Sequence, residues 1–283
     1  MTVAVSPGAR AHVALLALLL AGPVLAQGQP PASSELPLWE LGAVGFGVSQ
    51  QAYPGASEQV RRALVLPVAI YRGKYLRADR DTVGVRVVNQ ERFELDVGFA
   101  GAFGSRASET EARRGMPELG TLIEFGPRLK WNLGAAPADG RLRAEVALRG
   151  VFDLSDSLRY KGLALEPRLV YERRGDAGWR YGANVGPLLG NARLADTFYG
   201  VAPAYALPDR SAYVAQSGLI AWRLGVSASR AITPDLQLFV FGRLDSVAGA
   251  ANRASPLVQR TNGTSVGVGL SYTFARSSQR AND

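Results

Sequence analysis

The stretch from Gly263 to Phe274, G-T-S-V-G-V-G-L-S-Y-T-F, alternates between two kinds of side chain. Large apolar side chains share one face: Val266, Val268, Leu270, Tyr272 and Phe274. Small or polar side chains share the other: Ser265, Gly267, Gly269, Ser271 and Thr273. A period of two is that of a β-strand. An aromatic end and a small, polar opposite face favour a strand that meets lipid on one side and a packed interior on the other.

The same alternation recurs along the chain, with charged side chains on the second face. The clearest stretches are 91–104, 121–133, 140–153, 160–173, 178–190 and 218–231. In the last of them, Ile220, Trp222, Leu224 and Val226 share the apolar face. A soluble β-sandwich also alternates in this way. However, the apolar faces carry Phe, Trp and Tyr near strand ends, as in the aromatic girdles of outer-membrane barrels. We therefore expect an all-β fold, a transmembrane antiparallel β-barrel, with an exported soluble β-protein as the alternative.

The N-terminal residues indicate export. Arg10 and His12 precede the apolar run from Val13 to Ala21, and small residues lead to Ala26. This three-part pattern predicts a secretory signal peptide over 1–26. The apolar run is too short for a transmembrane helix, which needs about 20 apolar residues. We expect a short periplasmic segment at 27–37 and the outer-membrane barrel at 38–274, followed by a tail at 275–283.

Turn-forming residues divide the barrel region into about twelve strands and no helix. The predicted strands are 38–50, 61–72, 74–79, 83–89, 91–104, 121–133, 140–153, 160–173, 178–190, 212–231, 234–247 and 263–274. Short periplasmic turns should alternate with long outer loops. Two alternatives stay open: residues 74–89 as a single strand, which would change the parity, and a further strand within 191–211. Pro67, Pro127, Pro167 and Pro187 lack the N–H that strand pairing needs and predict bulges or register breaks.

The composition excludes several kinds of chemistry. The chain has no cysteine, and its only histidine, His12, lies in the predicted signal peptide. A Ser-His-Asp triad and an imidazole or thiolate zinc site are therefore not expected. We expect no enzyme, no cofactor, no metal and no catalytic residue. The formal charge of +8 would suit nucleic acid, but for an exported chain we expect anionic lipid headgroups and no nucleic acid as partners. Many arginines should pair with acidic side chains inside the barrel.

Several local patterns resemble functional sites without their context. Glu91, Glu94 and Asp96 form an acidic group that we expect in ion pairs. Asp79 and Asp81 are typical of a polar turn. Gly42, Gly45 and Gly47 lack the spacing of a phosphate loop and precede no helix. Arg174-Gly175-Asp176 matches an adhesion tripeptide, but Gly-Asp is also expected in a tight turn.

A set of short motifs in a shared order resembles the MipA/OmpV family and spans residues 38–274. In the first half these are Trp39-Glu40-Leu41-Gly42, Tyr53-Pro54-Gly55, Leu66-Pro67-Val68, Tyr71-Arg72-Gly73 and Arg92-Phe93-Glu94-Leu95-Asp96. In the second half they are Phe198-Tyr199-Gly200-Val201, Tyr213 before Gly218, Trp222-Arg223-Leu224-Gly225, Ser255-Pro256 and Gly269-Leu270-Ser271-Tyr272-Thr273-Phe274. The tail after Phe274 departs from barrels that end at the final aromatic.

The resemblance implies an outer-membrane protein in contact with lipid and lipopolysaccharide. In this family one member is described as a scaffold between a murein lytic transglycosylase and a bifunctional peptidoglycan synthase, and others are linked to adhesion. No catalytic residues carry over. The expected role is a non-enzymatic scaffold; a small-solute diffusion channel and a surface adhesin are the alternatives. About twelve strands is intermediate between a filled barrel and an open pore, so the strand count does not decide between them.

Overall fold

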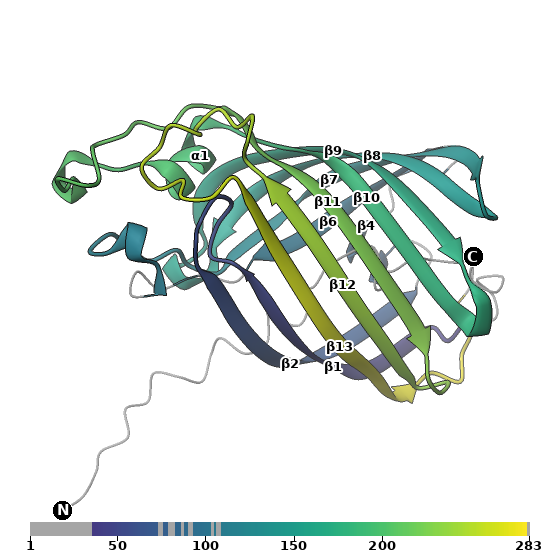
Figure 1. Ribbon diagram of the computed structural model, residues 1–283. Helices are drawn as coiled ribbons and strands as arrows, with labels where there is room; N and C mark the ends of the chain where they lie inside the picture. The colour runs from purple at the N-terminus through teal and green to yellow at the C-terminus, as the bar shows by residue number, and fades with distance from the viewer. Residues whose placement is uncertain are drawn as a thin grey trace, which may run out of the picture.

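The chain folds into a single curled antiparallel sheet (Figure 1). The computed structural model describes residues 36–72, 76–78, 83–85, 88–89, 93–102, 105 and 109–281. The strands are β1 (Trp39–Gln51), β2 (Gln59–Arg72), β3 (Leu76–Ala78), β4 (Val83–Val85), β5 (Val88–Asn89), β6 (Phe93–Ala102), β7 (Leu122–Ala136), β8 (Gly140–Asp153), β9 (Arg159–Arg174), β10 (Trp179–Gly190), β11 (Gly218–Ala231), β12 (Leu236–Ser246) and β13 (Asn262–Arg276). Their order in the sheet is β4-β3-β2-β1-β13-β12-β11-β10-β9-β8-β7-β6-β5.

Ten of these strands are long enough to cross a bilayer, so the prediction of about twelve was too high. The long strands are β1, β2 and β6 to β13, each with ten or more residues. Where strands 74–79 and 83–89 were expected, β3, β4 and β5 have only two or three residues each. A transmembrane strand needs about 9–11 residues. Consecutive long strands are neighbours, except β2 and β6, and β1 pairs with β13, the first long strand with the last.

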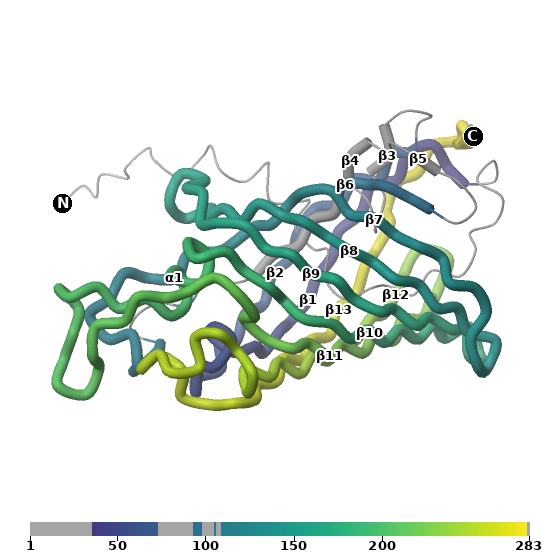
Figure 2. The backbone as a smooth tube through the Cα atoms, turned by 90° about the horizontal axis from the view of Figure 1, so that it is seen from above, coloured from purple at the N-terminus to yellow at the C-terminus, as the bar shows by residue number. Residues whose placement is uncertain are grey.

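Short turns lie at one end of the sheet and long loops at the other (Figure 2). The loop end carries the 3-10 helix η4 (Glu111–Arg113), the short η5 (Leu154–Asp156), α1 (Ala192–Tyr199) and η7 (Pro203–Tyr205). The turn end carries η6 (Asp176–Gly178). No helix was expected, yet α1 occupies the place of a possible strand. Asn191 caps it by accepting a hydrogen bond from the Leu194 N–H. None of the described helices is long and apolar enough to cross a membrane.

The predicted alternation is confirmed on the outer, convex face of the sheet. Large apolar side chains are exposed there, including Val65, Leu129, Trp131, Val146, Leu148, Leu163, Leu169, Val185, Trp222, Leu224, Val226, Val266, Val268 and Leu270. Their charged neighbours in sequence are buried on the concave face: Asp96, Arg128, Glu145, Arg149, Glu166 and Glu172. This inversion of the usual soluble pattern is what a lipid-facing sheet requires.

Ile220 is an exception, because it was expected on the outer face and is fully buried. Opposite it, the β10–β11 pairing shifts between Leu188 and Leu189, so that Leu188 pairs with Ala221 and Leu189 with Leu219. A bulge of this kind interrupts the alternation of faces. Ile220 therefore joins the buried side chains at the loop end.

Aromatic side chains form two bands on the outer face. Toward the turn end lie Trp39, Tyr71, Phe93, Trp131, Tyr171, Trp179, Tyr181, Tyr272 and Phe274. Toward the loop end lie Phe125, Phe152, Tyr160 and Trp222. Aliphatic side chains occupy the zone between the two bands. Outer-membrane barrels carry such an apolar zone between two aromatic girdles.

The prolines inside strands coincide with missing pairs. In the β9–β10 ladder, pairing stops at Val185↔Leu169 and resumes at Leu189↔Leu165, and both Pro167 and Pro187 lie in that gap. Pro127 lies in a similar gap of the β7–β8 ladder. Pro67 pairs with β1, while the described pairing of β2 with β3 involves only its last two residues. The register is the same on both sides of each gap, so these are missing pairs and not the predicted bulges or register breaks.

The two ends of the described chain pair with each other beyond the sheet. β13 continues past Phe274 to Arg276, and the Leu38 N–H donates to the Gln279 carbonyl at 2.8 Å. The Ala281 N–H donates to the Leu36 carbonyl at 2.7 Å. The predicted tail thus runs along residues 36–39 as an extension of the β1–β13 ladder. The predicted signal peptide and residues 27–35, together with Asp79, Asp81 and Glu91, lie outside the described residues.

Candidate functional site

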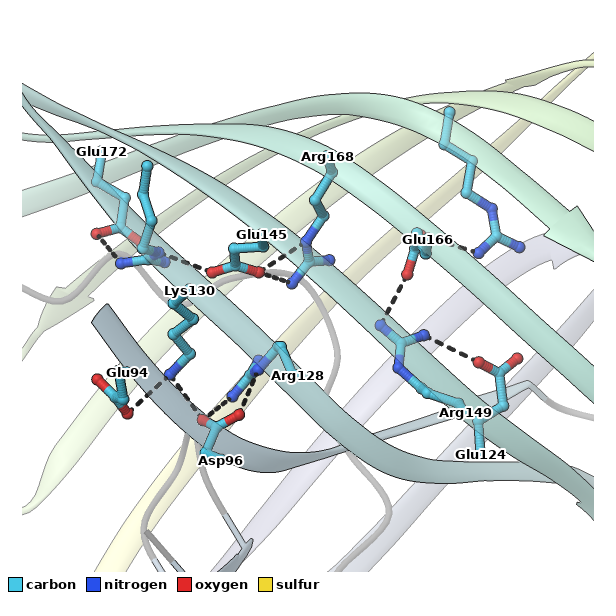
Figure 3. Close-up of polar contacts among 12 residues, drawn as sticks. Glu94, Asp96, Glu124, Arg128, Lys130, Glu145, Arg149, Glu166, Arg168 and Glu172 are labelled. Atoms are coloured by element: carbon cyan, nitrogen blue, oxygen red, sulfur yellow. Dashed lines mark hydrogen bonds and ion pairs between the residues drawn. The ribbon is translucent and has the colours of Figure 1, made fainter. Parts of the chain in front are cut away.

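The concave face of β6 to β9, β11 and β12 carries a dense set of ion pairs, part of which is drawn in Figure 3. Seven acidic side chains take part: Glu94, Asp96, Glu124, Glu145, Glu166, Glu172 and Asp245. Seven basic side chains take part: Arg128, Lys130, Arg143, Arg149, Arg168, Arg223 and Arg243. We call this set the inner ion-pair network, and its formal charges balance.

The first part of the network joins β6 to β7. The guanidinium of Arg128 donates to both Asp96 oxygens, from Nε at 2.9 Å and Nη2 at 2.6 Å. Lys130 Nζ lies 2.8 Å from Asp96 and 3.2 Å from Glu94. The sequence predicted ion pairs for Glu94 and Asp96, and both are found in them. Asp96 is 1% exposed, so its charge depends on these two cations.

The second part joins β8 to β9 around Glu145, which is 2% exposed. Arg143 Nε donates to one Glu145 oxygen at 2.7 Å, and Arg168 donates to the other from Nη2 at 2.6 Å. Arg143 also reaches Glu172 at 2.9 Å. Because Glu145 and Arg168 are directly opposite in the ladder, the register of the two strands sets this contact.

The third part runs from β7 to β12. Arg149 bridges Glu124 at 3.0 Å and Glu166 at 2.8 Å (Figure 3). Arg223 continues the row from Glu166, at 3.3 Å, to Asp245, at 3.4 Å. Arg243 ends it at 3.0 Å from Asp245. The side chains of five strands, β7, β8, β9, β11 and β12, are thus tied in one row, which stiffens this wall against inward movement.

On the concave face of β1, β2, β12 and β13 lies a hydrophobic group, which we call the apolar wall. Phe46, Val48 and Leu66 are buried there, with Val44, Leu64, Phe239 and Phe241 packed against them. The glycines of β13 make room for two of these rings. A Cβ on Gly269 would lie 2.3 Å from the Phe239 ring, and one on Gly267 would lie 2.4 Å from that of Phe241. Two phenylalanine rings therefore pack directly against glycines on the inner face of β13.

The long loops meet at the loop end in one buried hydrophobic group, which we call the loop cluster. Its loop members are Ala52, Tyr53, Ala56, Met116, Leu119, Leu194, Ala195, Tyr199, Val201, Ala215, Val247 and Leu257. Strand-end side chains join it: Val60, Leu122, Val151, Ala164, Leu188, Ile220 and Ala221. The latter group lies mostly on the concave side of β2 and β7 to β11. The loop cluster therefore extends over the loop end of the sheet and into its concave side.

Hydrogen bonds between different loops hold the loop cluster together. The Tyr53 hydroxyl donates to the Leu257 carbonyl at 2.8 Å, and the Tyr199 hydroxyl donates to the Pro54 carbonyl at 3.0 Å. The Ser255 hydroxyl donates to the Tyr199 carbonyl at 2.8 Å. Burial raises the pKa of both the Tyr53 and Tyr199 hydroxyls above the ordinary tyrosine value.

Two buried arginines tie the loops through backbone carbonyls. Arg210 donates to the carbonyls of Ala112 and Arg114 at 2.9 Å each and to that of Tyr205. Arg113 donates to the Pro117 carbonyl at 3.2 Å, and its guanidinium lies 5.9 Å from the Tyr53 ring centroid. Burial lowers the pKa of Arg113 from the usual arginine value. Carbonyl oxygens thus replace carboxylates as the partners of these charges.

Sequence reasoning missed the loop cluster, although several motifs quoted above lie in it. Tyr53-Pro54-Gly55, Phe198-Tyr199-Gly200-Val201 and Ser255-Pro256 come from three loops that are far apart in sequence. Their aromatic residues in otherwise turn-rich segments were the available signal. Only the fold shows that these motifs contact one another.

The remaining sequence patterns lie in ordinary strands and turns. Gly42, Gly45 and Gly47 lie within β1, and residues 174–176 lie at the β9–β10 turn. Within the ranges that the structure describes, no group of three or more His, Cys, Asp or Glu side chains is arranged to hold a metal ion.

Solved structures with a similar arrangement are outer-membrane proteins with low sequence identity. The NanC porin is 12% identical, with a TM-score of 0.35 over 83% of this chain and 98% of the porin. An outer-membrane channel from Pseudomonas putida F1 is 14% identical, with a TM-score of 0.37 over 88% of this chain and 100% of the channel. Outer membrane phospholipase A from Escherichia coli is 12% identical, with a TM-score of 0.36 over 82% and 92%. Scores in this range do not establish a shared function.

The family of this chain is identified by comparison of its sequence with a family model. No curated protein matches this chain significantly. The family model described as MltA-interacting protein MipA matches residues 42–274, which include the loop cluster and all or most of each long strand. The chain therefore belongs to the MipA family of MltA-interacting proteins.

Proposed function

We propose that this protein is a non-enzymatic outer-membrane β-barrel, closed to solutes, that anchors peptidoglycan-processing enzymes at the periplasmic face of the membrane. Its membrane placement is supported by the exposed aliphatic zone between two aromatic bands. In this placement the outer face contacts lipid and lipopolysaccharide, the loop end faces outward and the turn end faces the periplasm.

The curled sheet would close between β2 and β6. The short strands β3, β4 and β5 lie between those two long strands, and Cα atoms of β4 approach those of β6 to within 8 Å. Closure would pair those backbone groups of the facing β2 and β6 edges that the short strands do not cover, and a sheet in hydrocarbon needs such pairing. Ten long strands then form an even-numbered barrel.

The observation that carries the proposal is the loop cluster. A diffusion channel needs a path from the loops to the interior, whereas the loops here pack hydrophobic side chains over the concave side. The charge-balanced inner ion-pair network fills part of the same interior and offers no excess of one charge to select solutes. Both features suit a filled barrel that acts through its surface.

The expected protein partners are inferred from the family to which the chain belongs. Its description names a protein that interacts with the murein transglycosylase MltA, and a bifunctional peptidoglycan synthase is the second partner expected from the sequence resemblance. The surface available to periplasmic enzymes would be the turn end, with the paired termini at 36–39 and 277–281. An adhesive role would depend mainly on exposed residues 202–209, since most of the other long loops contribute to the loop cluster.

Two measurements test the proposal. In planar lipid bilayers we expect no steady current from the folded protein, and ohmic conductance steps would establish a channel instead. In cells, crosslinking followed by purification should recover a lytic transglycosylase. A purification without transglycosylase would remove the scaffold role while leaving the membrane barrel intact.

A further inference from the structure

A second cluster of charge lies on the outer face, at the turn end of β9, β10 and β11. It consists of Arg173, Trp179, Tyr181 and Arg230, and we call it the rim cluster. The Trp179 and Tyr181 rings stack, with centroids 6.2 Å apart and planes 15° apart. Arg173 Cζ lies 5.5 Å from the Tyr181 centroid, and Arg230 Cζ lies 6.0 Å from the Trp179 centroid. Two guanidiniums therefore flank one stacked aromatic pair.

The strand register produces this arrangement. Arg173 is directly opposite Tyr181 in the β9–β10 ladder, and Arg230 is directly opposite Trp179 in the β10–β11 ladder. All four side chains belong to the face that carries the exposed apolar residues of these strands. The rim cluster thus lies within the aromatic band at the turn end.

The two rim arginines lack acidic partners, unlike the arginines of the inner ion-pair network. Neither Arg173 nor Arg230 forms a hydrogen bond or an ion pair with any residue in the described part of the chain. Arg173 Nε is buried and has no acceptor. Because Arg173 Nε is inaccessible, an acceptor from outside the chain would contact the terminal nitrogens of the two guanidiniums, which have no acidic partner among the described residues.

We propose that the rim cluster binds the phosphate group of a glycerophospholipid in the periplasmic leaflet. The inference rests on the proposed membrane placement. Guanidinium forks match phosphate oxygens in geometry, and stacking on a ring orients them in advance. Trp and Tyr rings favour the headgroup level of a bilayer, where the phosphate lies. The stacked rings would then pack against the glycerol and the first acyl carbons.

Native mass spectrometry of the detergent-purified barrel with added phosphatidylglycerol tests this site. We expect the wild type to retain the lipid and the Arg173→Gln/Arg230→Gln variant to bind it at least about tenfold more weakly, since one hydrogen bond to a charged group typically contributes about tenfold in affinity. Diacylglycerol with the same acyl chains lacks the phosphate and should bind both proteins equally weakly. Inorganic phosphate should not displace the lipid; displacement would mean that the site binds phosphate from solution.

Two further variants separate the explanations. Arg61→Gln removes an exposed arginine from the outer face of β2 at the loop end, and it should leave binding unchanged. Arg173→Lys/Arg230→Lys keeps both charges but not the fork, so its affinity should lie between those of the wild type and the Gln variant. Equal lipid retention by the wild type and the Gln variant would overturn the site while leaving a folded membrane barrel. A chain that stays in solution without detergent would instead overturn the membrane placement itself.

Discussion

Arg128 and Asp96 face each other across the β6–β7 ladder, and two hydrogen bonds of 2.9 and 2.6 Å join the guanidinium to both carboxylate oxygens. Lys130 contacts the same carboxylate at 2.8 Å. One nearly inaccessible acid therefore pairs with two cations on the interior wall. This concentration of charge on a single side chain makes Asp96 the most informative residue of the inner ion-pair network to remove.

Asp96→Asn should destabilise the protein strongly. It removes the carboxylate that accepts two hydrogen bonds from Arg128 and also contacts Lys130, and breaking a buried pair from one side typically costs about 3–5 kcal/mol. Urea unfolding of the detergent-solubilised barrel, followed by tryptophan fluorescence, measures the loss. Glu94→Gln is the matched control, because the Glu94 side chain is 26% exposed and Lys130 keeps Asp96. Equal losses for the two variants would contradict the central role of Asp96.

Gly269→Ala should destabilise the apolar wall. The added methyl group would lie 2.3 Å from the Phe239 ring and 2.8 Å from the Gly45 carbonyl oxygen, which is backbone and cannot turn away. Overpacking of this kind typically costs about 1–3 kcal/mol. The same unfolding experiment on Gly47→Ala, where a Cβ meets nothing within 4 Å, provides the comparison. A loss no greater than that of Gly47→Ala would show that the strand yields at this point.

Tyr199→Ala should loosen the loop cluster without unfolding the sheet. It removes a fully buried ring and its hydrogen bond to Pro54, and such truncations typically cost about 3–5 kcal/mol. We expect faster cleavage of the long loops in limited proteolysis and the appearance of transient current in planar bilayers. Val214→Ala, at a side chain that is 85% exposed, should change neither. Unchanged cleavage of Tyr199→Ala would mean that the loop cluster does not hold the loops.

Alkaline pH should open the loop cluster. Burial raises the pKa of Tyr53 and Tyr199 in the folded state, so their hydroxyls lose protons more readily when the loops are open. The stabilisation is complete below the ordinary tyrosine pKa of about 10 and is lost as the pH rises through the folded-state value. Loop proteolysis measured across this range, beside tyrosinate absorbance, should show the onset. Tyr53→Phe/Tyr199→Phe cannot ionise at these sites, so its cleavage rate should rise less with pH.

The outer face of the sheet was predictable because it depends on local order alone. Val266, Val268 and Leu270 alternate with small side chains, and a strand sends alternate side chains to opposite faces whatever its neighbours are. Ile220 shows the limit of this rule, since the bulge that buries it arises from the pairing of β10 with β11. The strands expected at 74–79 and 83–89 are present only as the short strands β3, β4 and β5. The reason is related: the side-chain pattern of a short segment does not reveal how far its pairing with a neighbour extends.

The presence of ion pairs in the interior was predictable, but the partners in each pair were not. The charged faces indicated ion pairs, and Glu94 and Asp96 are found in them. Their partners depend on the register of β6 against β7, which side-chain types alone do not specify. The loop cluster was not foreseen, since Tyr53, Tyr199 and Leu257 belong to three loops separated by most of the chain.

The sequence by itself determined that this protein is built of strands with an apolar and a charged face. The reason is that the alternation of apolar and polar side chains can be seen in consecutive residues. It also determined the family, through motifs that span residues 42–274. The tertiary structure alone decided which charges meet, which rings rest on the glycines of β13, and that the loops pack over the concave side. The physical reason is that these contacts join residues far apart in sequence, and only curvature and register bring such residues within contact distance.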